Sequence, residues 1–188
     1  MWYTTGLTTT LLGWLALFWY NGVYTPLKKI TPSAVIPGSL IGAIPPLVGW
    51  VAGGESLLNP QGWFLSFFFF IWQVPHFYLL MLKYGKQYEN AGFPSLTAVY
   101  SEKIIRIIIF LWIIVTSAAA VFLPYFGLFS SIYTNMALII GIIWLDISFL
   151  LPIVRSNMIF RPFRYFMKIN YFVLFIMILL TLDNLLFI

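Results

Sequence analysis

The chain has 188 residues, of which 62% are apolar and only 8% are charged, and its formal net charge is +5. An average soluble domain has about 25% charged residues, so a water-soluble fold would leave too much apolar surface uncovered. Cysteine is absent, which excludes a disulfide framework, a thiolate nucleophile and a cysteine-based metal site. The basic residues are dispersed over three loops, so nucleic acid is not an expected partner.

Six apolar stretches predict six membrane spans, because a helix needs about 20 apolar residues to cross the hydrocarbon. Lipid cannot satisfy open backbone groups, and the short alternating strands of a β-barrel are missing, so the spans are expected to be helical. The predicted fold class is all-α, a polytopic transmembrane helical bundle that forms a single domain over residues 1–188. The predicted spans are 4–24, 34–53, 62–83, 104–125, 131–154 and 167–187.

The second and third predicted spans contain prolines, each of which removes a backbone donor. Pro45 and Pro46 predict a kink in the second span, and Pro75 predicts a break near the end of the third, beside His76. Breaks at membrane depth are tolerated where they are buried in protein or line a cavity. The same is expected of these two positions.

The longest gap between spans runs from Lys83 to Lys103 and is rich in polar and turn-forming residues. Long loops in compact proteins are usually either functional or disordered. Four aromatic residues in or near the gap argue against disorder: Tyr84, Tyr88, Phe93 and Tyr100. The gap is therefore predicted to form an ordered cap over a cavity.

The lysines and arginines all fall in or beside alternate gaps, in segments 25–33, 83–106 and 155–168. Basic residues stay on the cytoplasmic side of a membrane. The three segments are therefore predicted to be cytoplasmic, in a multi-pass protein of the inner (plasma) membrane. Chemistry on an anionic substrate is expected at that face.

Four motifs occur in an order and spacing that resemble one family. They are the strings 21–31 (NGVYTPLKKIT), 42–50 (GAIPPLVGW), 72–77 (WQVPHF) and 88–94 (YENAGFP). Together they are similar to the protoheme IX farnesyltransferase family, a branch of the UbiA-type intramembrane prenyltransferases. The resemblance extends from near residue 12 to the end. It implies a nine-helix fold, of which the chain looks like the last six helices.

The resemblance also implies an activity. The farnesyl group of farnesyl diphosphate is transferred to a vinyl group of haem B, and diphosphate is released, in haem A/O biosynthesis in the membrane. Mg²⁺ is the implied cofactor, because a diphosphate leaving group needs a metal and basic donors to absorb its charge. The family's Asn/Asp-rich metal motif lies in its first three helices, so this chain alone is expected to be inactive. Haem A synthase and terminal-oxidase assembly proteins are the implied protein partners.

The implied substrate-binding residues lie near the basic face. Each lysine among them would neutralise diphosphate or a haem propionate, or else would only anchor its loop. The tryptophan would stack on porphyrin or farnesyl, or would be packed at the interface. The substrate-binding candidates are Lys28, Lys29, Trp72, Gln73, Lys83, Lys86 and Tyr88. Trp72, Gln73 and His76 are expected to share one helical face.

His76 and Glu89 are the candidate catalytic residues. An ionisable side chain inside a span is costly and by default marks a function. His76 would ligate haem iron or act as the base for the added water, or it would merely bond to a carbonyl freed by Pro75. Glu89 and Asn90 offer oxygen ligands for Mg²⁺. The family has an acidic residue immediately before the position of Tyr88, where this chain has Gln87.

Two other interpretations remain open. A UbiA-type enzyme could prenylate an aromatic quinone precursor, but such enzymes typically carry an Asp-x-x-x-Asp pattern where this chain has Gln87 to Ala91. A non-enzymatic six-span transporter would place charged residues near the midplane. Only His76 and Asp146 are candidates for that, and Asp146 is expected to pair with Asn21 or with a loop base.

Overall fold

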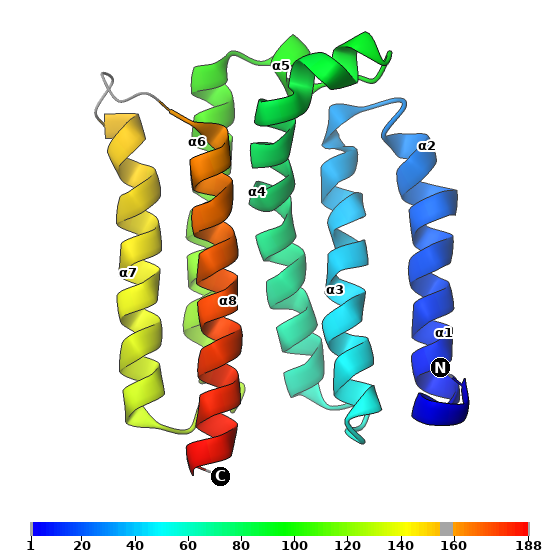
Figure 1. The fold of residues 1–188 in the computed structure, drawn as a ribbon, viewed down its shortest axis with the longest axis vertical. Coiled ribbons are helices and arrows are strands. Elements are labelled where there is room, and N and C mark those ends of the chain that lie inside the picture. Colours follow the sequence, from blue (N-terminus) through cyan, green and yellow to red (C-terminus); the bar gives the residue numbers. More distant parts are fainter. Residues whose placement is uncertain (1, 155–159, 188) are drawn as a thin grey trace.

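The computed structural model describes residues 2–154 and 160–187, and within these ranges every regular element is a helix (Figure 1). The long helices are α1 (Trp2–Phe18), α3 (Val35–Ala52), α4 (Pro60–Asn90), α6 (Glu102–Phe122), α7 (Ile132–Val154) and α8 (Pro162–Phe187). The short ones are the π-helix η1 (Trp19–Tyr24), α2 (Thr25–Leu27), the 3₁₀-helix η2 (Pro32–Ala34) and α5 (Leu96–Val99). The predicted all-α membrane bundle is confirmed.

Among the described residues, five helical segments are long and apolar enough to cross a membrane: Pro32–Ala52, Pro60–Asn90, Glu102–Phe122, Ile132–Val154 and Pro162–Leu186. The first predicted span, 4–24, is not among them, because it is divided between α1 and η1. Gly6 interrupts α1 with a φ of 86°, a left-handed value that glycine adopts readily. The hydroxyls of Thr9 and Thr10 donate to the carbonyl of Gly6 at 2.9 and 3.0 Å. These bonds satisfy a backbone acceptor at the interruption.

The helices run through their prolines. α3 is continuous across Pro45 and Pro46, and α4 continues past Pro75 to Asn90, so the predicted break at Pro75 is wrong. The φ of proline is compatible with a helix, and unwinding within lipid would expose further backbone groups that water cannot reach. Near the proline pair, Ser66 Oγ of α4 donates to the carbonyl of Ala43 at 2.6 Å and ties α3 to α4.

The segment predicted to be a loop after the third span is largely helical, because α4 continues to Asn90. At about 1.5 Å per residue, the 31 residues of α4 are about 46 Å long, so its last turns project beyond roughly 30 Å of hydrocarbon. Gly92, with a φ of 77°, ends the helix. Its amide donates to the carbonyl of Glu89, and the Phe93 amide donates to that of Tyr88, each at 2.9 Å.

One end of the bundle carries the basic segments. Figure 1 shows the turn after α2, the end of α4, α5 and the starts of α6 and α8 at the end opposite the two chain termini. Segments 25–33 and 83–106 belong to this end, as does the described part of 155–168. Residues 155–159, with Arg155, lie outside the described residues. The arrangement agrees with the alternation of charge along the sequence.

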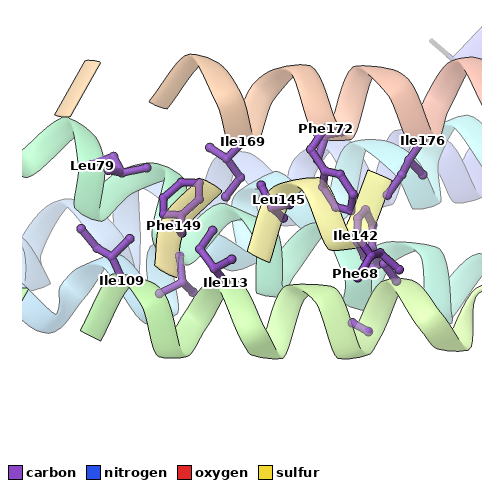
Figure 2. Close-up of a cluster of buried hydrophobic side chains, with 14 of the residues drawn as sticks. Phe68, Leu79, Ile109, Ile113, Ile142, Leu145, Phe149, Ile169, Phe172 and Ile176 are labelled. Atoms are coloured by element: carbon purple, nitrogen blue, oxygen red, sulfur yellow. The ribbon is translucent and has the colours of Figure 1, made fainter. Parts of the chain in front are cut away.

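An apolar core joins α4, α6, α7 and α8 (Figure 2). Phe68, Ile113, Leu145 and Ile169 are each completely buried in it. Lipid tails are as apolar as these side chains, so close packing rather than exclusion of water stabilises their contact.

Two carboxylates, one partly buried and one fully buried, form polar ties between helices. Ser117 Oγ of α6 donates to Asp146 Oδ1 of α7 at 2.6 Å, so the expected pairing of Asp146 with Asn21 or a base is wrong. Asp183, fully buried near the end of α8, accepts four hydrogen bonds at the start of α7. Its donors are the amides of Ser130 (2.7 Å) and Ser131 (3.0 Å) and the hydroxyls of Ser130 (2.9 Å) and Thr134 (2.5 Å).

Candidate active site

A cavity of about 120 Å³ lies at the basic end, where η1, α2, α3 and α4 meet. An adjoining hollow of about 260 Å³ shares Lys28, Tyr84 and Tyr88 with it. Together with Tyr24, these residues form what we call the lysine–tyrosine pocket. The remaining lining residues of the cavity are Thr31, Pro32, Ala34, Val35, Phe77, Leu80, Met81 and Pro94.

The helical extension of α4 creates much of this pocket. Phe77, Tyr84 and Tyr88 line it from one side of α4, because residues three or four apart lie on the same face of a helix. On α3, Gly38 makes room for Tyr24: a Cβ at this glycine would lie 2.6 Å from the tyrosine ring. The pocket therefore depends on the helical extension of α4, which aligns these side chains, and on the absence of a side chain at Gly38 of α3.

Lys28 supplies the positive charge of the pocket. It is partly buried, and it forms no ion pair within the described part of the chain. Its Nζ lies 5.7 Å from the ring centroid of Tyr24 and 5.6 Å from that of Phe93. Aromatic faces stabilise an ammonium group without neutralising it. The pocket can therefore hold an anionic group at Lys28 and an apolar group against α4.

His76 lies on α4 among aromatic rings. Its ring centroid is 4.8 Å from that of Trp72, 5.6 Å from that of Phe77 and 4.6 Å from that of Phe166 on α8. We call these four residues the histidine cluster. Phe77 also lines the lysine–tyrosine pocket, so the two sites are adjacent.

The polar surroundings of His76 are sparse. Asn170 of α8 is its hydrogen-bonding neighbour, whereas Nδ1 is buried and has no partner among the described residues. The interpretation in which His76 bonds to a carbonyl freed by Pro75 is therefore not supported. A buried ring nitrogen without a partner costs free energy, and it is available to a ligand or a water molecule.

The two candidates that precede His76 lie against different helices. Trp72 belongs to the histidine cluster, and its Nε1 donates to the carbonyl of Ile169 on α8 at 3.2 Å. Gln73 instead lies against Gly42 of α3, where a Cβ would collide with its amide. α4 packs between α3 and α8. Residues three apart differ by about 60° around a helix, and here that is enough to reach different neighbours.

The other candidate lysines line neither part of the lysine–tyrosine pocket. Lys29 and Lys86 are exposed. Lys83 is also exposed, and its Nζ lies 3.8 Å from the ring centroid of Phe163. Phe163 stacks on Phe166 with a centroid separation of 5.9 Å, so Lys83 borders the histidine cluster.

Glu89 holds α5 against the end of α4. The hydroxyls of Ser95 and Thr97 both donate to its Oε1, the latter at 2.7 Å. On this projecting part of α4, these two bonds, with a smaller effect of the nearby Lys86, lower the pKa of Glu89 below its ordinary value. No group of three or more His, Cys, Asp or Glu side chains that could hold a metal occurs within the described residues. Glu89 and Asn90 therefore do not make up a magnesium site by themselves.

Tyr24 and Tyr84 are pocket residues that the sequence analysis did not select. Tyr84 is seven residues after Phe77 and four before Tyr88, a spacing that places all three on one helical face. This spacing has no such meaning in a loop, and the segment that starts at Lys83 was predicted to be one. Tyr24 carries no such signal, because its position depends on contact with α3.

Comparison with known proteins identifies a matching family and several relatives. The model of the UbiA prenyltransferase family matches residues 1–181. A protoheme IX farnesyltransferase of Oleidesulfovibrio alaskensis is 34% identical over 96% of this chain and 61% of its own length. One from Geobacter sulfurreducens is 39% identical over 63% of this chain and 44% of its own. One from Bacillus thuringiensis is 40% identical over 54% of this chain and 34% of its own length.

These alignments cover less than two thirds of each relative, and the chain spans about three fifths of the length of the Oleidesulfovibrio alaskensis protein. No solved structure matches the chain. The family predicted from the four motifs is the family whose model matches, so the predicted relationship is confirmed. The chain belongs to the UbiA prenyltransferase family.

Proposed function

We propose that the protein takes part in the transfer of the farnesyl group of farnesyl diphosphate to a vinyl group of haem B, which produces haem O. The observation that supports this best is that relatives from three distinct genera, all named protoheme IX farnesyltransferase, match the chain. The adjacency of the two sites agrees with this reaction. The lysine–tyrosine pocket suits an anionic amphiphile, and the histidine cluster suits a flat aromatic molecule.

In this reaction the bond between farnesyl C1 and oxygen breaks, and its electron pair leaves with the diphosphate. The π electrons of the vinyl group form the new bond to C1 through the terminal vinyl carbon. The inner vinyl carbon then carries positive charge beside the porphyrin, takes up water and releases one proton. Haem B, farnesyl diphosphate and water thus give haem O, diphosphate and a proton.

Each site has a proposed part in these steps. Lys28 binds the diphosphate and stabilises the charge that develops on it. The rings of Tyr24, Tyr84 and Tyr88 face the allylic cation, which aromatic faces stabilise. His76, whose Nδ1 is without a partner, either accepts the proton of the added water or ligates the iron.

Mg²⁺ is proposed as the cofactor on the chemistry of the leaving group, since it would neutralise part of the diphosphate charge. Mg²⁺ prefers about six oxygen ligands in octahedral geometry. Glu89 and Asn90 offer too few, and one oxygen of Glu89 is already engaged by two hydroxyls. These two residues do not fit a complete site, so Lys28 is the diphosphate-binding group that this chain supplies.

The basic end of this multi-pass membrane protein is proposed to face the cytoplasm, across a bacterial inner membrane, because basic segments are retained on that side. Farnesyl diphosphate is anionic and would reach the lysine–tyrosine pocket from there. Haem A synthase and terminal-oxidase assembly proteins are proposed partners, since they would receive the product.

The function is tested with the protein as its gene encodes it, expressed in cells that make no haem O of their own. Haems are extracted and separated by chromatography, and membranes are assayed with haem B and farnesyl diphosphate. Haem O is the expected product, and an aromatic quinone precursor offered in place of haem B is expected to remain unprenylated. Accumulation of the protein without haem O, or prenylation of the quinone precursor alone, would refute the assignment.

His76 gives a further prediction. His76→Ala is expected to lower kcat for haem O formation by about 100-fold, the lower end of the effect of removing a general base, with a smaller change in the KM for farnesyl diphosphate. If iron ligation is the role, the absorption spectrum of haem B bound to the membranes shifts in the variant. If proton transfer is the role, that spectrum is unchanged and the pH profile of kcat flattens. Undiminished activity with an unchanged spectrum would remove His76 from the site.

A further inference from the structure

A separate cavity lies between the ends of α6 and α7, also at the basic end of the bundle. It measures about 260 Å³ and is lined by Lys103, Arg106, Ile107, Pro152 and Ile153. None of these residues lines the lysine–tyrosine pocket. The cavity combines two cations with three apolar side chains on helices that cross the membrane.

Two contacts hold the guanidinium of Arg106 in place at the cationic side of this cavity. The guanidinium carbon of Arg106 lies 4.6 Å from the ring centroid of Phe160, and its Nη2 donates to Glu102 Oε1 at 2.6 Å. The Glu102 side chain is 58% exposed, so this ion pair is screened by water, but Glu102 still offsets the charge of Arg106. Lys103 is exposed and forms no ion pair within the described residues. The cavity therefore keeps a positive charge at the membrane surface.

The apolar side continues from the cavity toward the middle of the bilayer. Ile107, Leu111 and Ile114 follow one another on one side of α6, at i, i+4 and i+7, and their exposed fractions are 40%, 58% and 41%. Pro152 and Ile153 form the opposite wall of the cavity. An exposed apolar strip thus begins directly below two cations.

We propose that this cavity binds an anionic phospholipid, with its phosphate at Lys103 and Arg106 and an acyl chain along Ile107, Leu111 and Ile114. Basic pockets between membrane helices select lipids of net negative charge, since each cation near the surface attracts them. A zwitterionic lipid lacks that net charge. A free phosphate would make no use of the apolar strip.

The test is native mass spectrometry of the purified protein, as its gene encodes it, in detergent with equal amounts of phosphatidylglycerol and phosphatidylcholine. The wild type is expected to retain phosphatidylglycerol preferentially. Lys103→Gln is expected to weaken that retention about fivefold, and the double variant with Arg106→Gln more than tenfold. Arg161→Gln is the matched control, because Arg161 is an exposed cation directly before α8 that does not line the cavity. It is expected to change retention less than twofold.

Equal retention of the two lipids by the wild type would overturn the assignment, as would a loss in Arg161→Gln as large as in Lys103→Gln. Two competition arms identify the ligand. Displacement by millimolar inorganic phosphate would assign the cavity to free anions, and preferential displacement by farnesyl diphosphate would assign it to a prenyl substrate. Lys103 is exposed, so its single variant decides the matter even if the double variant unfolds. None of these readouts depends on haem O formation.

Discussion

Replacing Lys28 with glutamine is expected to raise the KM for farnesyl diphosphate by about 10- to 100-fold. A charge-assisted hydrogen bond contributes roughly 1.5–3 kcal/mol, and Lys28 is the cation that the pocket offers to a diphosphate. Glutamine keeps a polar side chain, one atom shorter than that of lysine, but removes the charge that Tyr24 and Phe93 stabilise. The measurement is the rate of haem O formation in membranes over a range of farnesyl diphosphate concentrations.

Two comparison variants sharpen this test. Lys28→Arg retains the charge and is expected to recover most of the loss. Lys29→Gln removes a neighbouring exposed cation that does not line the pocket, and its KM is expected to change less than threefold. Equal effects of Lys28→Gln and Lys29→Gln would mean that general attraction to the basic end, rather than binding in the pocket, governs the affinity.

Replacing Asp183 with alanine is expected to destabilise the bundle by about 3 kcal/mol or more. The change leaves the amides of Ser130 and Ser131 without their acceptor, and each unsatisfied group of this kind costs about 1–3 kcal/mol. The hydroxyl of Thr134 can still donate to the carbonyl of Ser131. For a chain of this size the melting temperature should fall by about 6–12 °C. Thermal unfolding in detergent, followed by circular dichroism, measures the shift.

Asp146→Asn is the matched control for this stability prediction. Asp146 is also a carboxylate within the bundle, but the bond from Ser117 is the one hydrogen bond to it found in the described part of the chain. An amide oxygen can still accept that bond, so the melting temperature should fall by no more than about 3 °C. Similar shifts for the two variants would show that the four bonds to Asp183 do not act as a tie between α7 and α8.

Much of the fold could be predicted from the sequence because lipid imposes a simple rule on length and polarity. Stretches such as 104–125 and 131–154 match α6 and α7 to within a few residues, and the charge alternation agrees with the basic end of the bundle. The end of α4 could not be predicted in this way. Gly85 is typical of a loop, yet here it lets Thr97 of α5 pack against the helix. Contacts of this kind are not visible in local sequence.

The candidate site was predicted in part. Lys28 and Tyr88, which are far apart in the sequence, lie in one pocket as the motifs suggest, and Trp72 lies beside His76. Gln73 was expected to share a face with Trp72 and His76 but lies against Gly42 of α3, because helical spacing predicts a direction and not which helix lies there. The sequence suggested that Glu89 is a metal ligand. In the structure its carboxylate accepts hydrogen bonds from Ser95 and Thr97, which follow six and eight residues later.

The uninterrupted length of α4 constrains how any ligand can lie. His76 and Tyr88 are twelve residues apart on one continuous helix, a rise of about 18 Å, which exceeds half the thickness of the hydrocarbon. A molecule that contacts both residues must therefore extend along the axis of α4, with its charged group toward water and its apolar part in the hydrocarbon. The site therefore selects a ligand by how deeply it extends into the membrane, and not by its shape alone.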